Sequence, residues 1–235
     1  MENLTLLTYT NSKASDLHNI YFDRIEKFFD IKNHLVLTDK SIDNKNIQLS
    51  LYKEDDGYWK HILNALKNVK TDYIIYAQED YILFDFVDIG KINNFIEVLD
   101  NDSNISFIRL IYSGVDYYPE QYNKDLIYLK SEHEYYFSTQ VTIWRKQNLI
   151  DLFSNSKTNT IWEESSNSKY LKELNKIGLC VKEKGKKIGG HYNSLVYPYI
   201  ATAIVKGKWN YSQYKNELDD IFINYNVNKE QRELR

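Results

Sequence analysis

The sequence predicts one α/β domain built around a mostly parallel central sheet. Two observations predict this class. Short β-rich runs alternate with segments of helical periodicity, and the apolar run from Tyr73 to Ala77 stops at two adjacent carboxylates, Glu79 and Asp80. Alternating strands and helices form parallel sheets through right-handed crossovers. Ligands bind beyond the carboxyl ends of the strands in such sheets. We therefore expect Glu79 and Asp80 at a cleft; the alternative is a solvated acidic turn.

The first half of the chain shows this alternation most clearly. Residues 4–9 are β-rich, and Ser15-Asp16 can cap a helix whose apolar residues recur at helical spacing up to Phe29. In chain order, the predicted elements are a strand at 4–9, a helix at 17–29, a strand at 34–39, a helix at 58–69 and the central strand from 73.

The second half is more irregular and more aromatic. Its predicted elements are a helix at 88–99, strands at 105–112, 126–129 and 135–144, helices at 146–153 and 163–177, and a strand at 179–181. Nothing resembles a domain-scale linker. We therefore expect a single domain over 1–235, with a half of nucleotide-binding α/β style at 1–112 and a more irregular half with a C-terminal segment at 113–235.

Composition excludes several classes of protein. The 235 residues carry 30 basic and 33 acidic side chains, a formal charge of −3, which argues against nucleic-acid binding. The single cysteine, Cys180, allows no disulfide within the chain and no cysteine-based metal site. The sequence shows neither a signal peptide nor an apolar run of about 18 residues. We expect a cytoplasmic protein with at most peripheral contact at the inner face of the membrane.

A family resemblance rests on the order of several short motifs. Leu4 to Tyr9, Leu35 to Asp39, Trp59 to Leu66 and Tyr73 to Asp80 occur in the order found in nucleotide-sugar glycosyltransferases of the GT-A fold. The chain resembles the bacterial family-2-like enzymes of surface polysaccharide assembly most. Ser138 to Arg145 and Ile161 to Glu164 are similar to the acceptor-side half of that family, so the resemblance spans about residues 4–180.

The resemblance implies a GT-A-like, Rossmann-like sheet and a hexosyltransferase-like activity. It also implies that 1–112 form the nucleotide-sugar-binding half and 113–235 the acceptor-side half with the C-terminal segment. The enzyme would move a sugar from a nucleoside-diphosphate donor, with a UDP-sugar favoured, to a hydroxyl of a glycan or of a lipid-linked acceptor. It does not specify the nucleotide, the acceptor, the stereochemical outcome or the oligomeric state, because pocket shape and not fold decides these.

The family holds a divalent ion with an Asp-any-Asp motif at the end of a strand. The matching triplet here is Gln78-Glu79-Asp80. Asp80 occupies the last position, so the resemblance implies that it binds Mn²⁺ or Mg²⁺. Gln78 departs from the motif, which puts metal dependence in doubt. A C-terminal histidine completes the metal site in some GT-A enzymes, and His191 is the candidate; the alternative is a histidine in a surface turn.

The donor site is expected at the first and second strands. The family binds the nucleoside base at the end of the first strand and with an acidic residue after the second, which here are Thr8, Tyr9 and Asp39. The resemblance also assigns Trp59 and Glu79 to the donor site. The alternatives are ordinary packing at the end of a strand for Thr8 and Tyr9, and a helix or turn cap for Asp39.

An inverting transferase needs a base for the acceptor hydroxyl. Glu163 and Glu164 are the candidates, with Glu164 preferred; the alternative is the usual preference of acidic residues for a first helical turn. Tyr136, Trp144 and Trp162 are the expected acceptor-binding residues, although a role in the core is the alternative for the tryptophans.

Two rival functions remain open at this stage. A catalytically inactive glycan-binding module on the same scaffold would explain Gln78. A sugar-nucleotide nucleotidyltransferase would share the α/β fold, but we would expect it to open with a glycine-rich phosphate loop, and Thr10 to Lys13 contains no glycine. The lysine-rich run over 182–187 is a solvated hairpin, a contact for a diphosphate or a contact for an anionic membrane surface.

Overall fold

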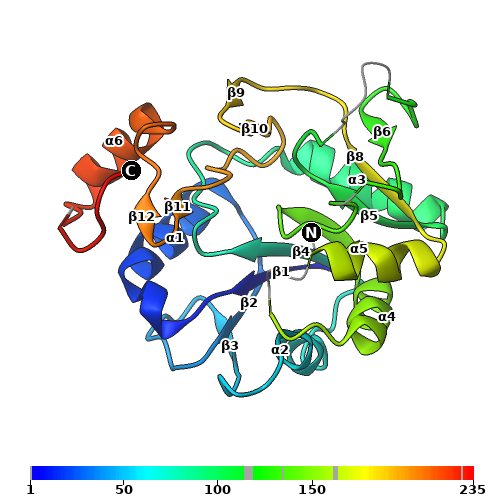
Figure 1. Ribbon diagram of the computed structural model, residues 1–235, viewed down its shortest axis with the longest axis horizontal. Coiled ribbons are helices and arrows are strands. Elements are labelled where there is room, and N and C mark those ends of the chain that lie inside the picture. The colour runs from blue at the N-terminus through cyan, green and yellow to red at the C-terminus, as the bar shows by residue number, and fades with distance from the viewer. Residues whose placement is uncertain (1, 114–118, 134, 161–163, 229) are drawn as a thin grey trace.

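An eight-stranded sheet forms the centre of the protein (Figure 1). The computed structural model describes residues 2–113, 119–133, 135–160, 164–228 and 230–235. The sheet order is β3-β2-β1-β4-β7-β5-β8-β6. The strands are β1 (Leu4–Tyr9), β2 (Asn33–Thr38), β3 (Gln48–Leu51), β4 (Tyr73–Gln78), β5 (Ile105–Arg109), β6 (Leu126–Tyr128), β7 (Thr142–Arg145) and β8 (Ile177–Val181).

Most of the neighbouring strands in this sheet run parallel. The strands β3, β2, β1 and β4 are parallel to one another, and β5 is parallel to β8. The strand β7 lies antiparallel between β4 and β5, and β6 is antiparallel to β8. The predicted α/β class with a mostly parallel sheet is therefore confirmed. The carboxyl ends of β1, β2 and β4 consequently meet at one edge of the sheet.

The described residues form one 3₁₀ turn and six α-helices, and five of the α-helices cover the two faces of the sheet. They are the 3₁₀ turn η1 (Ser12–Ala14), α1 (Ser15–Phe28), α2 (Tyr58–Leu66), α3 (Ile89–Asn101), α4 (Lys146–Ser156), α5 (Glu164–Glu173) and α6 (Lys215–Asn224). One core cluster joins α1 and α3 to one face, and a second joins α2, α4 and α5 to the other. None of these helices, within the described residues, combines the length and the apolar character needed to cross a bilayer.

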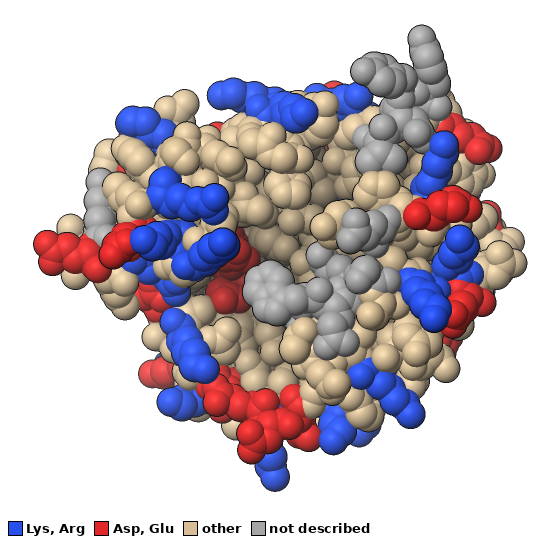
Figure 2. Space-filling model, in the orientation of Figure 1, with Lys and Arg blue, Asp and Glu red and all other residues tan. Residues whose placement is uncertain are grey.

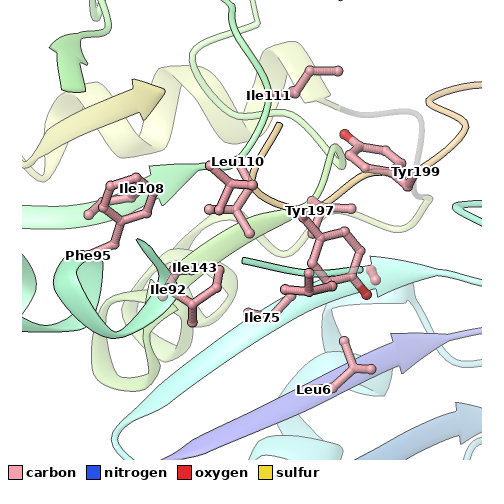
Figure 3. Packing of buried hydrophobic residues seen from close by; sticks show 14 of the residues in the cluster. Leu6, Ile75, Ile92, Phe95, Ile108, Leu110, Ile111, Ile143, Tyr197 and Tyr199 are labelled. Atoms are coloured by element: carbon pink, nitrogen blue, oxygen red, sulfur yellow. The ribbon is translucent and has the colours of Figure 1, made fainter. Parts of the chain in front are cut away.

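Side chains of β1 and β4 alternate between the two cores. Leu6 and Ile75 contribute to the cluster shown in Figure 3, together with Ile92 and Phe95 of α3. Leu7, by contrast, packs with α2 on the opposite face. Strands that are buried on both faces read as continuous apolar runs. This is why 73–77 is so apolar, and why polar residues appear only where the strand ends.

The C-terminal segment packs against α1 at the carboxyl edge of the sheet. It contains the hairpins β9 (Lys187–Ile188) with β10 (His191–Tyr192) and β11 (Ile204–Val205) with β12 (Lys208–Trp209), followed by α6. A third apolar cluster joins Leu17 and Ile20 of α1 to Trp209 and Leu218. Figure 1 shows α6, β11 and β12 next to α1, on the left of the view. The last residues of the chain thus return to the region where β1 ends.

Several predicted elements are wrong in extent. The strand predicted at 105–112 ends at Arg109, and the helix predicted at 163–177 ends at Glu173, because 177–181 form β8. Residues 135–144 were expected to form a strand, but β7 contains only Thr142–Arg145. The preceding stretch is irregular: the Arg109 guanidinium donates to the carbonyl oxygens of Tyr135 and Tyr136 at 3.0 and 2.8 Å, and the Phe137 amide donates to Ser168 Oγ. Side chains thus satisfy polar backbone groups that a strand would pair with another strand.

Candidate functional site

The fold gathers several of the predicted site residues at the carboxyl edge of the sheet. Tyr9 and Gln78 are register partners at the ends of β1 and β4. Asp39 follows β2 directly, and the Thr10 amide bonds to the Leu37 carbonyl of that strand at 2.9 Å. Figure 2, in the orientation of Figure 1, shows a hollow at the centre of this face, with acidic side chains on the wall next to the C-terminal segment.

Glu79 and Asp80 form a turn immediately after β4. Both are partly buried, and the Tyr81 amide closes the turn on the Gln78 carbonyl at 3.1 Å. Burial, followed by the charge of Asp80, raises the pKa of Glu79 to about 8. Burial likewise raises the pKa of Asp80 to about 7. Two adjacent carboxyl groups with raised pKa values form a site where a cation would be stabilising.

Asp80 also presents an unsatisfied oxygen. Its Oδ1 is buried and has no hydrogen-bond partner among the described residues. Buried polar atoms rarely lack a partner, and such an atom needs an explanation. An unpaired carboxylate oxygen is the type of ligand that Mg²⁺ and Mn²⁺ prefer. The donor set therefore fits one divalent ion held mainly by Asp80, with the remaining ligands supplied by a substrate.

The other predicted metal ligands do not complete a cluster. Within the described residues, no group of three or more His, Cys, Asp or Glu side chains is placed to hold a metal ion. Gln78 offers only an amide oxygen. His191 belongs to the β9–β10 hairpin, where it is the register partner of Ile188. The role of His191 as a metal ligand stays a prediction.

Asp39 connects the end of β2 to the loop that follows β1. Its Oδ1 accepts from the Ser12 amide at 2.5 Å and its Oδ2 from Ser12 Oγ at 2.6 Å. Burial alone would raise the pKa of Asp39, but these hydrogen bonds outweigh burial and lower it. The carboxylate lines a cleft of about 700 Å³ together with Tyr52 and three lysines. An ionised acceptor at the mouth of a cleft suits a ligand that carries N–H or O–H groups.

A group of flat rings beside Tyr9 was not anticipated. The Tyr9 and Tyr52 rings are stacked, with centroids 5.5 Å apart, and Tyr52 stacks on His61 at 4.0 Å. Tyr9 Oη lies 3.2 Å from His61 Nδ1. Tyr58 packs edge-on against Tyr9, and Trp59 packs against the same core. A planar group can stack against this wall of the site. The spacing of the rings in α2 was the sequence signal that could have revealed the group.

Three predicted contact residues belong to the core, and their assignment was wrong. Thr8 is fully buried, and its Oγ1 bonds to Tyr21 Oη and His34 Nε2, both at 2.9 Å. Trp144 is 1% exposed and packs against aromatic rings of the second core cluster. Tyr136 is 2% exposed and donates to the Lys176 carbonyl. Thr8 and Trp144 lie on central strands that are buried on both faces, so these side chains have no surface to offer a ligand.

The predicted catalytic residues lie at the limit of what the structure describes. Glu163 and Trp162 are outside the described residues, and Glu164 is the first residue of α5. The segment leading toward them is placed: the Tyr58 and Trp59 amides at the start of α2 donate to the Asn159 and Thr158 carbonyls at 2.9 and 3.0 Å. The chain thus passes the ring group shortly before Glu163. The roles of both glutamates and of Trp162 stay predictions.

Comparison with known proteins supports the fold. No protein-family model matches the chain, and no curated protein matches it. Among solved structures, S. aureus TarS overlaps it with a TM-score of 0.52 and 13% identity over 94% of this chain and 40% of TarS. TarS 1–349 in complex with UDP-GlcNAc gives 0.50 and 14% over 80% of this chain and 60% of that one.

One further solved structure is a weaker match. A cytidylyltransferase from Leptospira borgpetersenii overlaps at a TM-score of 0.49 and 13% identity over 95% of both chains, too low a score to carry an inference. The chain spans only 40 to 60% of the TarS chains that it matches. At these identities the comparison establishes the fold alone, a GT-A-like α/β fold shared with TarS.

Proposed function

We propose that this protein is a glycosyltransferase that moves a sugar from a nucleoside-diphosphate donor to a hydroxyl of a glycan or lipid-linked acceptor in surface polysaccharide assembly. One observation carries the proposal. The Glu79–Asp80 pair ends β4 at the ligand-binding edge of the sheet, and a buried oxygen of Asp80 has no partner among the described residues. The fold shared with TarS, which binds UDP-GlcNAc, supports a UDP-sugar as donor.

Different residues would bind the base, the nucleoside and the diphosphate of the donor. The stacked rings of Tyr9 and Tyr52 can hold the planar base, and Asp39 can accept hydrogen bonds from the nucleoside. Asp80 would hold a divalent ion against the donor diphosphate. Such an ion offsets the charge that develops on the leaving group.

The acceptor needs a separate group that removes a proton. A carboxylate within hydrogen-bond reach of the acceptor hydroxyl would take that proton as the hydroxyl oxygen attacks the anomeric carbon. We assign this role to Glu164, or to Glu163, because both follow the segment that runs along the ring group. If the reaction retains configuration, neither is required as a base.

Gln78 is compatible with one other function, that of a glycan-binding module. It lies where the resemblance implies a carboxylate, and its neutral amide weakens any metal site. A glycan-binding module without turnover would tolerate that change. For the nucleotidyltransferase alternative, the segment after β1 offers less, because it forms the short turn η1 and contains no glycine.

Thermal unfolding in the presence of candidate donors tests the proposal. UDP-, GDP-, CMP- and dTDP-sugars are each added with Mn²⁺ or with EDTA, because a donor that binds only the folded protein raises the unfolding midpoint. We expect one donor to act with Mn²⁺, to lose its effect in Asp80→Ala, and to keep it in the control Asp85→Ala, an exposed aspartate.

Each of the other possible outcomes favours a different interpretation. A shift that does not depend on metal would remove Asp80 from metal binding but keep the donor site. If the protein binds sugar but releases no nucleotide from the donors when candidate acceptors are present, the result would favour the glycan-binding module. If no donor shifts the midpoint at saturation, the proposed function is refuted.

A further inference from the structure

The C-terminal tail brings an arginine to the carboxyl edge of the sheet. Arg232 Nε donates to Asp16 Oδ2 at 2.5 Å, and its Nη2 donates to Asp16 Oδ1 at 2.9 Å. Only 15% of the arginine side chain and 14% of the aspartate side chain are exposed. Asp16 lies in the first turn of α1, which closely follows the end of β1. Figure 2 shows basic side chains beside the acidic wall of the hollow, over the C-terminal segment.

The tail is held firmly directly after this arginine. The Trp209 amide donates to the Glu233 carbonyl at 2.9 Å, and the Arg235 amide donates to the Trp209 carbonyl at 2.8 Å. Trp209 itself is 1% exposed. Arg232 Nη1 also donates to the Gly207 carbonyl at 3.2 Å. Because the backbone and the guanidinium are both fixed, Arg232 would lose little conformational entropy on binding a ligand.

The guanidinium retains binding capacity. It has five N–H groups, and three of them donate to Asp16 and Gly207. The other two have no partner among the described residues. Asp16, which holds the guanidinium, lies only four residues after Ser12, whose amide and hydroxyl bind Asp39 at the end of β2. Arg232 is thus fixed beside the strand ends that carry the acidic residues, close enough to interact electrostatically with Glu79 and Asp80. A site with two carboxylates would otherwise repel an anionic donor. A fixed cation beside them would reduce that repulsion.

We propose that Arg232 is a donor-binding residue whose two remaining N–H groups bind the diphosphate, and that Asp16 positions it. The inference rests on the proposed function, because it requires a nucleoside-diphosphate ligand in this hollow. Arginine suits the task because its planar fork matches phosphate oxygens. The competing interpretation is that Arg232 only ties the tail to α1.

The ratio of affinities for UDP and UMP separates these two interpretations. The two nucleotides differ by one phosphate, so the ratio reports contacts to the diphosphate. Titration calorimetry of the wild type with UDP, UMP, GDP and GMP, with Mn²⁺ and with EDTA, identifies the nucleotide that binds. The variants are Arg232→Gln, Asp16→Asn and, as a control, Arg235→Gln, which removes an exposed arginine three residues away.

We expect Arg232→Gln to lower the diphosphate-to-monophosphate ratio by about tenfold to a hundredfold, the usual effect of losing hydrogen bonds to a charged group. Asp16→Asn should lower the ratio by less than Arg232→Gln does, since the guanidinium at 232 is intact but loses one of its two acceptors on residue 16. Arg235→Gln should keep the ratio within about threefold of wild type. If Arg232→Gln does not fold, Arg232→Lys keeps the charge but loses the fork, and should still lower the ratio severalfold.

Three outcomes would overturn the inference. An unchanged ratio in Arg232→Gln, or in Arg232→Lys if only that variant folds, would show that the diphosphate does not contact the arginine. An equal loss in Arg232→Gln and Asp16→Asn would show a structural role for the ion pair. If the wild type binds none of the nucleotides, the proposed function fails as well, whereas in the first two cases it stands.

Discussion

Replacing Asp80 by asparagine should make the ligand-free protein more stable at alkaline pH. Burial raises the pKa of Asp80 from 3.8 to about 7, so folding favours its neutral form. The favourable contribution is complete below the pKa of the unfolded chain, near 4, and is lost as pH rises through about 7. At pH 8 the folded protein therefore carries an unfavourable ionised carboxylate, which asparagine removes with little change of shape.

The magnitude follows from that displacement. Each pKa unit is worth about 1.4 kcal/mol, so the displacement sets an upper limit of about 4 kcal/mol. Asp80 is partly exposed, and solvent screens part of its charge, so we expect about 1–3 kcal/mol. For a chain of this length, 1 kcal/mol moves the unfolding midpoint by about 2–4 °C. The expected rise at pH 8 is thus about 2–12 °C.

Thermal unfolding followed by circular dichroism measures this difference. Wild type, Asp80→Asn and the exposed control Asp85→Asn are compared in EDTA at pH 5 and pH 8. The gain should be large at pH 8, less than half as large at pH 5, because part of the displacement already acts above the pKa of the unfolded chain, and absent from the control at both. The reasoning is refuted if Asp80→Asn is less stable than wild type at pH 8, or if its gain does not change with pH.

Three further predictions test other residues. Asp39→Asn should act in the opposite direction: the lowered pKa of Asp39 stabilises the fold above about pH 4, and this contribution is lost as pH falls, so urea unfolding should show a cost at pH 7 that shrinks at acidic pH. Trp144→Ala should lower the free energy of unfolding by about 3–5 kcal/mol; a loss under about 1 kcal/mol would contradict its place in the core. Glu164→Gln, or Glu163→Gln, should lower kcat by about 10²–10⁴ with donor affinity unchanged; unchanged turnover in both variants would exclude a glutamate base here.

Local periodicity predicted the elements that build the sheet and missed those fixed by distant contacts. The strands β1, β2 and β4 and the helices α1 and α2 begin within a few residues of expectation, because their apolar patterns are strong. The strand β3 was missed, since it buries only one of its four residues. The position of α6 depends on pairs such as Arg24 with Asp220, which no local pattern reveals.

The same division applies to the candidate site. Tyr9, Asp39 and Asp80 could be placed at one edge because each ends a recognisable parallel strand. Tyr52 and Arg232 could not, because β3 had no clear signal and the tail reaches α1 only through tertiary packing. Trp144 misled the prediction because burial, and not residue type, decides whether an indole is available to a sugar.

A crystal structure with a bound nucleoside diphosphate would test the central claim most directly. Crystals soaked with UDP or GDP and Mn²⁺ should show the nucleotide at the carboxyl ends of β1 and β4. The base should lie against Tyr9 and Tyr52, and the diphosphate beside Asp80 and Arg232. Density for the nucleotide at a different surface, or an Asp80 carboxylate that contacts neither metal nor phosphate in the occupied site, would contradict the account.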